Sequence, residues 1–251
     1  MAFYDRISKG AKDRLIDTSD NPLTLDGKKI KRVDTMRYLG FEISDELKNI
    51  KHWNKRKSLA INAVSKLKTL GLITNQMHPN MKAHLYKTYV RPALTYGCEN
   101  MNINASSLND IKRTEGNIVK GLLNIPRRCR TTSLFLSLNI MPTDYIIINI
   151  KVDFFNRLIE NEFTKKMMIE LAKQLIPNDF ISEILDITRE LEEENMSLQD
   201  KCKLVKLNNI TEYRSNQKND VKVQKLRDIY KTGSKDNISG LIFQICRFDV
   251  A

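Results

Sequence analysis

Apolar residues alternate with polar ones over residues 23–44 and then recur at a helical spacing. The alternation brackets Asp26-Gly27, a dipeptide typical of a two-residue hairpin turn, because such turns need positive φ angles. The run 36–44 predicts a further strand, and its apolar side chains would share one face: Leu39, Phe41 and Ile43. We therefore expect a small antiparallel meander near the N-terminus.

Gly40 falls in the middle of that last run. A glycine inside a strand weakens pairing and leaves no side chain to pack. It is tolerated where the chain bulges or where another group must approach the backbone closely. We expect one of these two reasons to apply at Gly40.

From residue 45 onward the spacing of apolar residues is helical. Segments 45–70, 79–91 and 106–123 carry apolar stripes, and further amphipathic patterns follow at 219–231 and 238–247. Pro92 should end or kink the second helix, and the predicted N-cap of the third is Ser106 or Ser107. The residues predicted to face inward are Ile50, Trp53, Ala60, Val64 and Leu67 in the first helix and Met81, Leu85, Tyr89 and Val90 in the second.

The expected fold is mainly α, with a small N-terminal antiparallel β-hairpin or meander, then a helical bundle, then further helices. The character of the sequence changes near residues 45 and 164, which suggests three regions: 1–45, 46–164 and 165–251. With 41% hydrophobic residues, the chain can bury a core.

Net charge is +12, and its distribution is uneven. Residues 51–150 hold 15 Lys and Arg against 4 Asp and Glu, whereas residues 151–251 hold 17 of each kind. A basic block of this kind is typical of a protein that binds a polyanion. The alternative is a helical bundle whose lysine-rich faces are merely solvated.

Several functional classes lack their signatures. The chain contains no GxSxG, HExxH, P-loop or GxGxxG motif, and no two adjacent aspartates that could hold paired metal ions. Its 4 cysteines are too scattered for a zinc site, so we expect reduced thiols. With neither a signal peptide nor a membrane-spanning apolar run, we expect an intracellular protein of the nucleus or cytoplasm, with no membrane partner.

Basic residues gather at the ends of the predicted elements. The segment KHWNKRK surrounds Trp53 with cations, the loop PRRCR carries three arginines, and a further arginine precedes Pro92. Arginine suits phosphate because its planar fork donates two parallel hydrogen bonds. The candidate phosphate contacts are Lys51, Lys55, Arg56, Lys57, Arg91, Arg127, Arg128 and Arg130. The alternative for the loop is that its charges are solvated or paired with Asp110 and Glu115, and for Trp53 we favour core packing.

Four segments follow one another along the chain in this order: RYLGFEIS, KTYVRPALTYGCEN, IKRTEGNIVKGLLNIPRRCR and LNIMPTDYIIINIKVDFFNRLI. Together, over residues 22–159, they resemble the region just after the catalytic palm in non-LTR (LINE-like) retrotransposon reverse transcriptases. The resemblance implies that Tyr38, Leu39 and Gly40 form the primer grip, and that the following helices form a thumb. A primer sugar-phosphate lying against its backbone would then explain Gly40.

The family's catalytic motif, an aromatic residue followed by x-Asp-Asp, lies upstream of the primer grip and has no counterpart in this sequence. The family is an RNA-directed DNA polymerase, but we expect this chain to be inactive alone. We expect no cofactor in this chain, since Mg²⁺ would belong to the missing palm.

The resemblance predicts a fragment that binds template–primer, either RNA or an RNA–DNA duplex, by its backbone and shape. A separate palm-bearing polypeptide is a possible partner. The alternative is a non-enzymatic helical protein-interaction module derived from a decayed or repurposed element, whose partners would bind the helices of residues 165–251.

Overall fold

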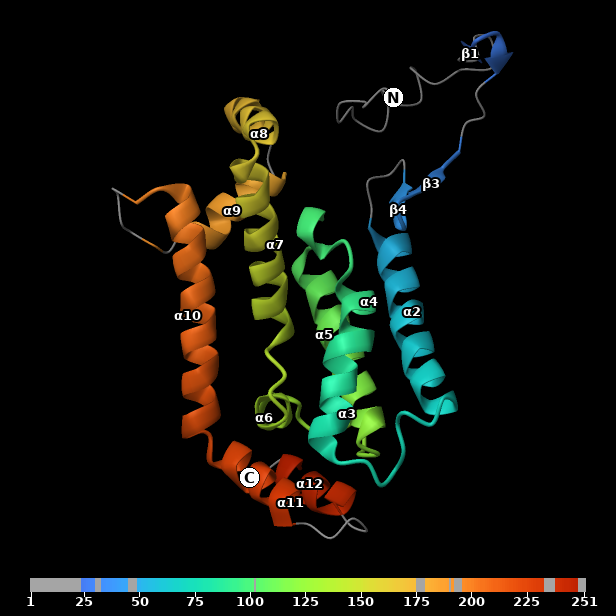
Figure 1. The fold of residues 1–251 in the computed structure, drawn as a ribbon, viewed down its shortest axis with the longest axis vertical. Coiled ribbons are helices and arrows are strands. Elements are labelled where there is room, and N and C mark those ends of the chain that lie inside the picture. Colours follow the sequence, from blue (N-terminus) through green and yellow to red (C-terminus); the bar gives the residue numbers. More distant parts are fainter. Residues whose placement is uncertain are drawn as a thin grey trace. The chain divides into compact units, whose positions relative to one another are not determined.

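The computed structural model of this chain describes residues 24–29, 33–44, 49–101, 103–174, 179–189, 191, 196–232 and 238–247. The chain divides into two compact units, Met1–Lys48 and Asn49–Ala251 (Figure 1). The first four residues of the predicted helix 45–70 lie outside the described residues.

The described residues of the N-terminal unit, 24–29 and 33–44, form two short hairpins. In the first, β1 (Thr24–Leu25) pairs antiparallel with β2 (Lys28–Lys29). Asp26 and Gly27 have φ angles of 50° and 75°, as the two central residues of a type I′ turn require. The turn predicted from this dipeptide is confirmed.

The second hairpin corrects the prediction for residues 36–44. These residues are not one strand, because β3 (Thr35–Tyr38) turns back at Leu39-Gly40 and pairs with β4 (Phe41–Ser44). Leu39 and Gly40 have φ angles of 46° and 79°, so this turn also has positive φ at both central residues. Gly40 is explained by its turn conformation, which a residue without Cβ adopts at no steric cost.

The turn also changes which side chains share a face. Tyr38 lies opposite Phe41 and Met36 opposite Ile43, so these four form one apolar face. Leu39 is in the turn and does not belong to that face, contrary to the alternation prediction. Among the described residues the two hairpins form separate two-stranded sheets, and the expected meander is not present.

The described residues of the second unit form helices joined by loops, with no strand among them, so the prediction of a mainly α fold is confirmed. Its elements are α2 (Ile50–Thr69), α3 (Pro79–Leu85), the π-helical turn η1 (Tyr86–Val90), α4 (Arg91–Thr95), the 3₁₀ turn η2 (Cys98–Asn100), α5 (Ala105–Leu122), α6 (Thr132–Ser137), α7 (Thr143–Glu160), α8 (Glu162–Gln174), α9 (Phe180–Thr188), α10 (Leu198–Asn219), α11 (Val221–Thr232) and α12 (Ile238–Cys246).

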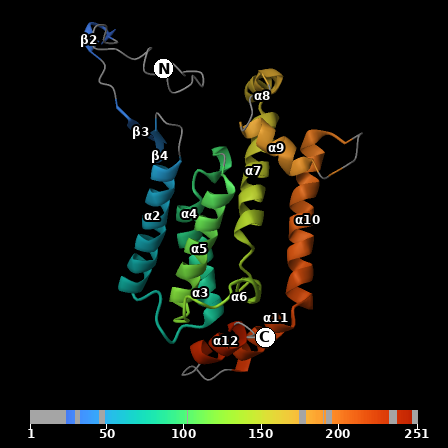
Figure 2. The same ribbon diagram turned by 180° about the vertical axis from the view of Figure 1, so that it is seen from behind.

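The long helices of this unit run side by side in both views (Figures 1 and 2). α2 packs on η1, α4 and α5, α5 packs on α7, and α7 packs on α8, α9 and α10. α11 packs against α6 and α12 at one end of these helices. The later helices are thereby packed onto the earlier ones through α7 and α6.

The π-helical turn η1 comes just before Pro92. The Arg91 N–H donates to the Tyr86 carbonyl, one residue further back than in an α-helix. A widened turn accommodates a proline that has no N–H and whose ring excludes the regular bond. The buried stripe of this segment includes Tyr86 and Val90, which are fully buried, whereas Met81 and Tyr89, predicted to face inward, are 52% and 57% exposed.

Two further local predictions can be checked. The N-cap of α5 is Asn104, not Ser106 or Ser107, and its side chain accepts a hydrogen bond from the Ser107 N–H at 2.8 Å. In α2, Trp53 is buried as expected, but Ile50 is 59% exposed.

No helix in the described parts of the chain combines the length and apolarity needed to cross a bilayer.

Candidate nucleic-acid interface

The loop between α5 and α6 contains the sequence PRRCR. The Cys129 N–H donates to the Pro126 carbonyl at 3.2 Å, which closes a tight turn with Arg127 and Arg128 at its centre. The side chains of Arg127, Arg128 and Arg130 are all exposed. This basic loop, residues 126–130, therefore presents three guanidinium groups on its outer side.

Lys120, in the last turn of α5, holds the basic loop from the inside. Its side chain is buried, and Nζ donates to the carbonyl oxygens of Arg127 at 2.5 Å and Cys129 at 3.2 Å. Burial lowers the pKa of the Lys120 ammonium group. A lysine that binds two loop carbonyls fixes the backbone and leaves the arginine side chains outside. The charge pattern alone did not distinguish this lysine from the surface cations.

The last helix, α12, supports the basic loop from another side. The Arg130 N–H donates to the Cys246 carbonyl at 3.3 Å, and the Arg128 guanidinium carbon lies 5.2 Å from the centre of the Phe243 ring. The sequence beyond residue 165 carried no recognisable chemistry. The contribution of α12 to the loop is therefore visible only in the tertiary structure.

The two acids considered as partners of the loop arginines are engaged elsewhere. Asp110 pairs with Lys57 at 2.5 Å, and Glu115 pairs with Arg91 at 2.8 Å. Within the described ranges, no carboxylate pairs with Arg127 or Arg128. The alternative in which Asp110 and Glu115 neutralise the loop is therefore wrong.

Glu115 is the centre of a buried polar cluster. It is completely buried, and it accepts hydrogen bonds from the Tyr86 hydroxyl at 2.6 Å and from the Thr143 hydroxyl. Arg91 is only 6% exposed and also donates to the Met141 carbonyl at 2.5 Å. Burial and the nearby Glu115 raise the pKa of the Tyr86 hydroxyl well above its ordinary value. Arg91 therefore belongs to the interior and not to the candidate interface.

The predicted contacts on α2 divide in the same way. Lys51 is exposed and Lys55 half-buried, whereas Arg56 is 8% exposed and stacks over the Tyr96 ring at 4.1 Å. The Arg56 Nε also donates to Nε2 of His52 at 3.2 Å. Lys57 is half-buried and pairs with Asp110, so Lys51 is the one of these four predicted contacts that is exposed.

The cations of α2 and the basic loop do not form one cluster. Lys57 meets α5 at Asp110, near the start of α5, while the loop follows Leu122 at its end. Twelve helical residues separate these two positions, which is about 18 Å along the axis of α5. A ligand that contacts both groups of cations must therefore be extended, as a nucleic-acid backbone is.

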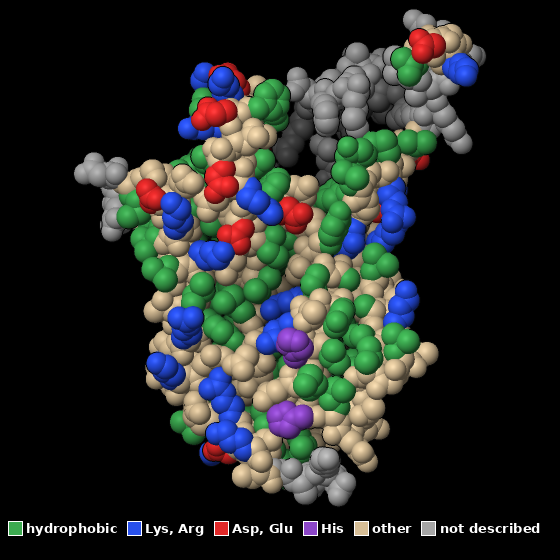
Figure 3. Space-filling model, viewed as in Figure 1, with side chains coloured by type: hydrophobic (Ala, Val, Ile, Leu, Met, Phe, Trp, Pro, Cys, Tyr) green, Lys and Arg blue, Asp and Glu red, His purple; other side chains and the backbone are tan. Residues whose placement is uncertain are grey.

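The structure adds a basic area that the counts over long blocks did not reveal. Residues 214–232 hold 6 Lys and Arg against 2 acids, within a C-terminal region that is neutral overall. Figure 3 shows basic side chains over the lower part of α10 and over α11, while acids gather toward α8 and α9. A pocket of about 560 Å³ opens there, and no acid lines it; its basic lining residues are His78, Arg227 and Lys231.

His78 has a structural role in that pocket. Its Nε2 donates to the Tyr230 carbonyl at 2.8 Å, and its Nδ1 accepts from the Asn80 N–H at 3.2 Å as the N-cap of α3. Arg227 donates to the Asn139 side-chain oxygen at 3.2 Å. The ring of His78 thus shapes the pocket, while the charge of the pocket comes from Arg227 and Lys231.

The predicted primer-grip residues lie at the tip of the second hairpin. Tyr38 is 61% exposed and Leu39 76% exposed, with Gly40 completing the turn. They belong to the N-terminal unit, whereas the basic loop belongs to the helical unit.

The described residues contain no group of three or more His, Cys, Asp or Glu side chains placed to hold a metal ion. All four cysteines are buried thiols. Burial raises the pKa of Cys98 to about 12 and those of Cys202 and Cys246 to about 11.

No protein-family model, curated protein sequence or solved structure matches this chain.

Proposed function

We propose that the helical unit binds the sugar-phosphate backbone of a nucleic-acid duplex, with Arg127, Arg128 and Arg130 as its main phosphate contacts. The observation that carries this proposal is the basic loop itself. Its three arginines are exposed on a backbone that buried Lys120 holds through two carbonyls. Because the loop backbone is already held, binding phosphates does not have to supply the cost of ordering it.

The ligand we favour is a template–primer, as RNA or an RNA–DNA duplex, read through its backbone and shape. The resemblance of the sequence to the post-palm region of non-LTR reverse transcriptases supports this choice. On this view Lys51 and Lys55 contact the same backbone further along, and Tyr38, Leu39 and Gly40 contact the primer. Any polymerase chemistry, with its Mg²⁺, would come from a palm-bearing partner.

The test is duplex binding by fluorescence anisotropy over a series of salt concentrations. The slope of log K against log [salt] is negative. Replacing Arg127, Arg128 and Arg130 by alanine should reduce its magnitude by about 2 to 3, because each lost phosphate contact removes nearly one released counterion. The matched control replaces three exposed lysines on other helices, Lys68, Lys165 and Lys166, and so removes the same net charge.

The comparison separates a site from a general attraction. A local interface predicts that the arginine variant loses most of the affinity while the lysine variant keeps it. Equal losses in the two variants would mean that only net charge matters. Wild-type protein that does not bind at all at low salt would overturn the proposal.

A second candidate function, a helical protein-interaction module, is favoured by the surface of α8. This helix has no buried residue, and its Phe163, Met167 and Ile169 are 75%, 51% and 48% exposed. Phe163 and Met167 are four residues apart and therefore lie on the same side of the helix, and adjoining exposed apolar side chains are typical of a contact surface. This candidate predicts no salt-dependent duplex binding, so the same titration distinguishes the two functions.

A further inference from the structure

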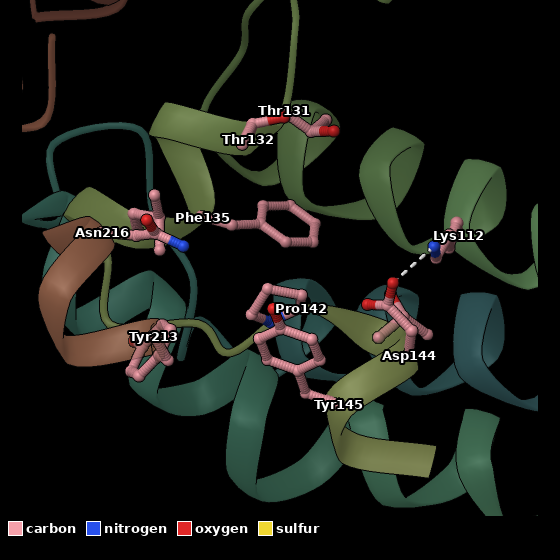
Figure 4. Close-up of a pocket in the computed structure, with 11 residues that line it drawn as sticks. Lys112, Thr131, Thr132, Phe135, Pro142, Asp144, Tyr145, Tyr213 and Asn216 are labelled. Carbon is pink, nitrogen blue, oxygen red and sulfur yellow. Dashed lines mark hydrogen bonds and ion pairs between the residues drawn. The ribbon is translucent and has the colours of Figure 1, made fainter. Parts of the chain in front are cut away.

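A second pocket opens directly beside the basic loop. It has a volume of about 320 Å³ and lies between α5, α6, α7 and α10 (Figure 4). That volume is at the lower end of the range for small-molecule sites, and it is large enough for one aromatic heterocycle. Neither the charge pattern nor the resemblance indicated a pocket here.

Flat apolar side chains form its walls. Figure 4 shows Phe135 of α6 on one side of the space and Pro142 and Tyr145 on the other, with Tyr213 of α10 at its edge. Burial raises the pKa of Tyr213, and burial with the Glu212 carboxylate raises that of Tyr145 to about 12, so both phenols are neutral. Faces of this kind stack on planar rings.

The pocket also contains an unmet hydrogen-bond acceptor. Asp144 Oδ2 accepts from Lys112 Nζ at 2.7 Å, whereas Oδ1 is buried and has no hydrogen-bond partner. In Figure 4 this second oxygen points away from Lys112, toward Pro142. A carboxylate beside an ammonium group in the wall of the pocket suits a ring whose edge carries an N–H donor and an acceptor. Lys112 neutralises the charge of Asp144 and offers donors of its own beside it.

The position of the pocket relates it to the arginines. Thr131 lines the pocket and follows Arg130 directly in the chain, so their Cα atoms are about 3.8 Å apart. α5 approaches Thr131 closely, because a Cβ atom at Gly116 would lie 3.0 Å from Thr131 Cγ2. The wall next to the basic loop is therefore fixed by α5.

We propose that this pocket binds the base of one unpaired nucleotide, while the basic loop holds the adjoining phosphates. The proposal rests on the proposed function, since it adds a base site to a backbone-binding surface. The four common bases all carry a planar π face and, on the pairing edge, an N–H donor next to an acceptor. The Asp144 carboxylate accepts from the donor, and Lys112 donates to the acceptor.

The experiment uses the full chain and three RNA–DNA duplexes of one sequence: one blunt, one with a single-nucleotide overhang, and one whose overhang is abasic. Binding is measured by anisotropy at fixed salt. We expect the overhang duplex to bind about 5- to 150-fold more tightly than either of the others, the range given by stacking of one base on aromatic side chains. The abasic overhang has the same added phosphate, so it isolates the contribution of the base.

Two substitutions assign the gain to the pocket. Tyr213→Leu should reduce the ratio of affinities for the overhang and abasic duplexes toward one, and Tyr213→Phe, which keeps the ring, should preserve it. Tyr89→Leu is the matched control, because Tyr89 is an exposed tyrosine outside the pocket. Circular dichroism melts verify that each variant folds.

The outcomes distinguish the two proposals. Equal binding of all three duplexes by wild-type protein overturns the base pocket and leaves the backbone interface standing, whether or not any variant folds. A gain that survives in folded Tyr213→Leu overturns it as well. Failure of every duplex to bind at low salt overturns the proposed function, and the inference with it.

Discussion

The substitution Lys120→Met separates the order of the basic loop from its charge. Methionine keeps the length of the buried side chain but removes the bonds to the carbonyl oxygens of Arg127 at 2.5 Å and Cys129 at 3.2 Å. Hydrogen bonds from a charged donor contribute about 1.5–3 kcal/mol each. The cost of burying the ammonium group, which lowers its pKa, offsets part of this. We expect the free energy of unfolding to fall by about 1–3 kcal/mol.

The effect on binding follows from conformational entropy. Ordering the backbone of one residue costs about 1–2 kcal/mol, and binding must supply that cost if the loop is no longer held. If one residue loses its order, duplex affinity should fall about five- to thirtyfold. The salt slope should stay within about 0.5 of wild type, because buried Lys120 contacts no phosphate and all three arginines remain.

The assay is anisotropy over a salt series, with urea unfolding of the same samples. Lys66→Met is the control, since Lys66 is an exposed lysine in the last turn of α2. Unchanged affinity in Lys120→Met would show that the loop needs no internal support. A salt slope whose magnitude is smaller by about 1 would show that Lys120 itself contacts phosphate.

Three further predictions concern stability. Glu115→Gln should lower the free energy of unfolding in urea by about 3–5 kcal/mol, because Arg91 would stay buried without its carboxylate, and a loss below about 1 kcal/mol would contradict that role. Leu39→Asn should relieve the strain of a φ angle of 46°, which suits leucine poorly. The opening free energy measured by amide exchange in residues 36–43 should therefore rise by about 1–2 kcal/mol, and unchanged exchange would argue against strain. The Cys98 thiol has its pKa raised from 9.0 to about 12 by burial, so above pH 9 the unfolded chain ionises first and stability falls. Wild-type stability should therefore fall with pH more steeply than that of Cys98→Ala, by up to about 1.4 kcal/mol per pH unit, and parallel urea curves from pH 8 to 10.5 would refute this.

Features that depend on neighbours in the chain were predictable from the sequence. Asp26-Gly27 predicted its hairpin because the turn needs only its own two residues. The stripe in α2 placed Trp53 in the core, and the amphipathic pattern at 238–247 predicted α12. The three arginines of PRRCR are exposed, as a proline-led loop suggests.

Errors arose where one local rule overrode another. Alternation across residues 36–44 concealed a turn at Leu39-Gly40, because leucine is a rare residue at positive φ. At Pro92, the proline rule predicted a kink but not the π-helical turn. In the same segment Met81 and Tyr89 were assigned to the core, whereas Tyr86 and Val90 are the fully buried residues. Apolar residues occur on both faces of this segment, so the helical period alone did not decide which face is buried.

The sequence by itself determined the mainly helical class, the hairpin at Asp26-Gly27 and the presence of a basic loop. Only the tertiary structure decided which cations face solvent, since Arg91 meets Glu115 from another helix and Lys120 meets the carbonyls of its own loop. It also brought α12 against that loop and formed a pocket from four helices beside it. The physical reason is that helical period and turn type depend on the nearest few residues, whereas the burial of a charge depends on what the packed neighbours offer it.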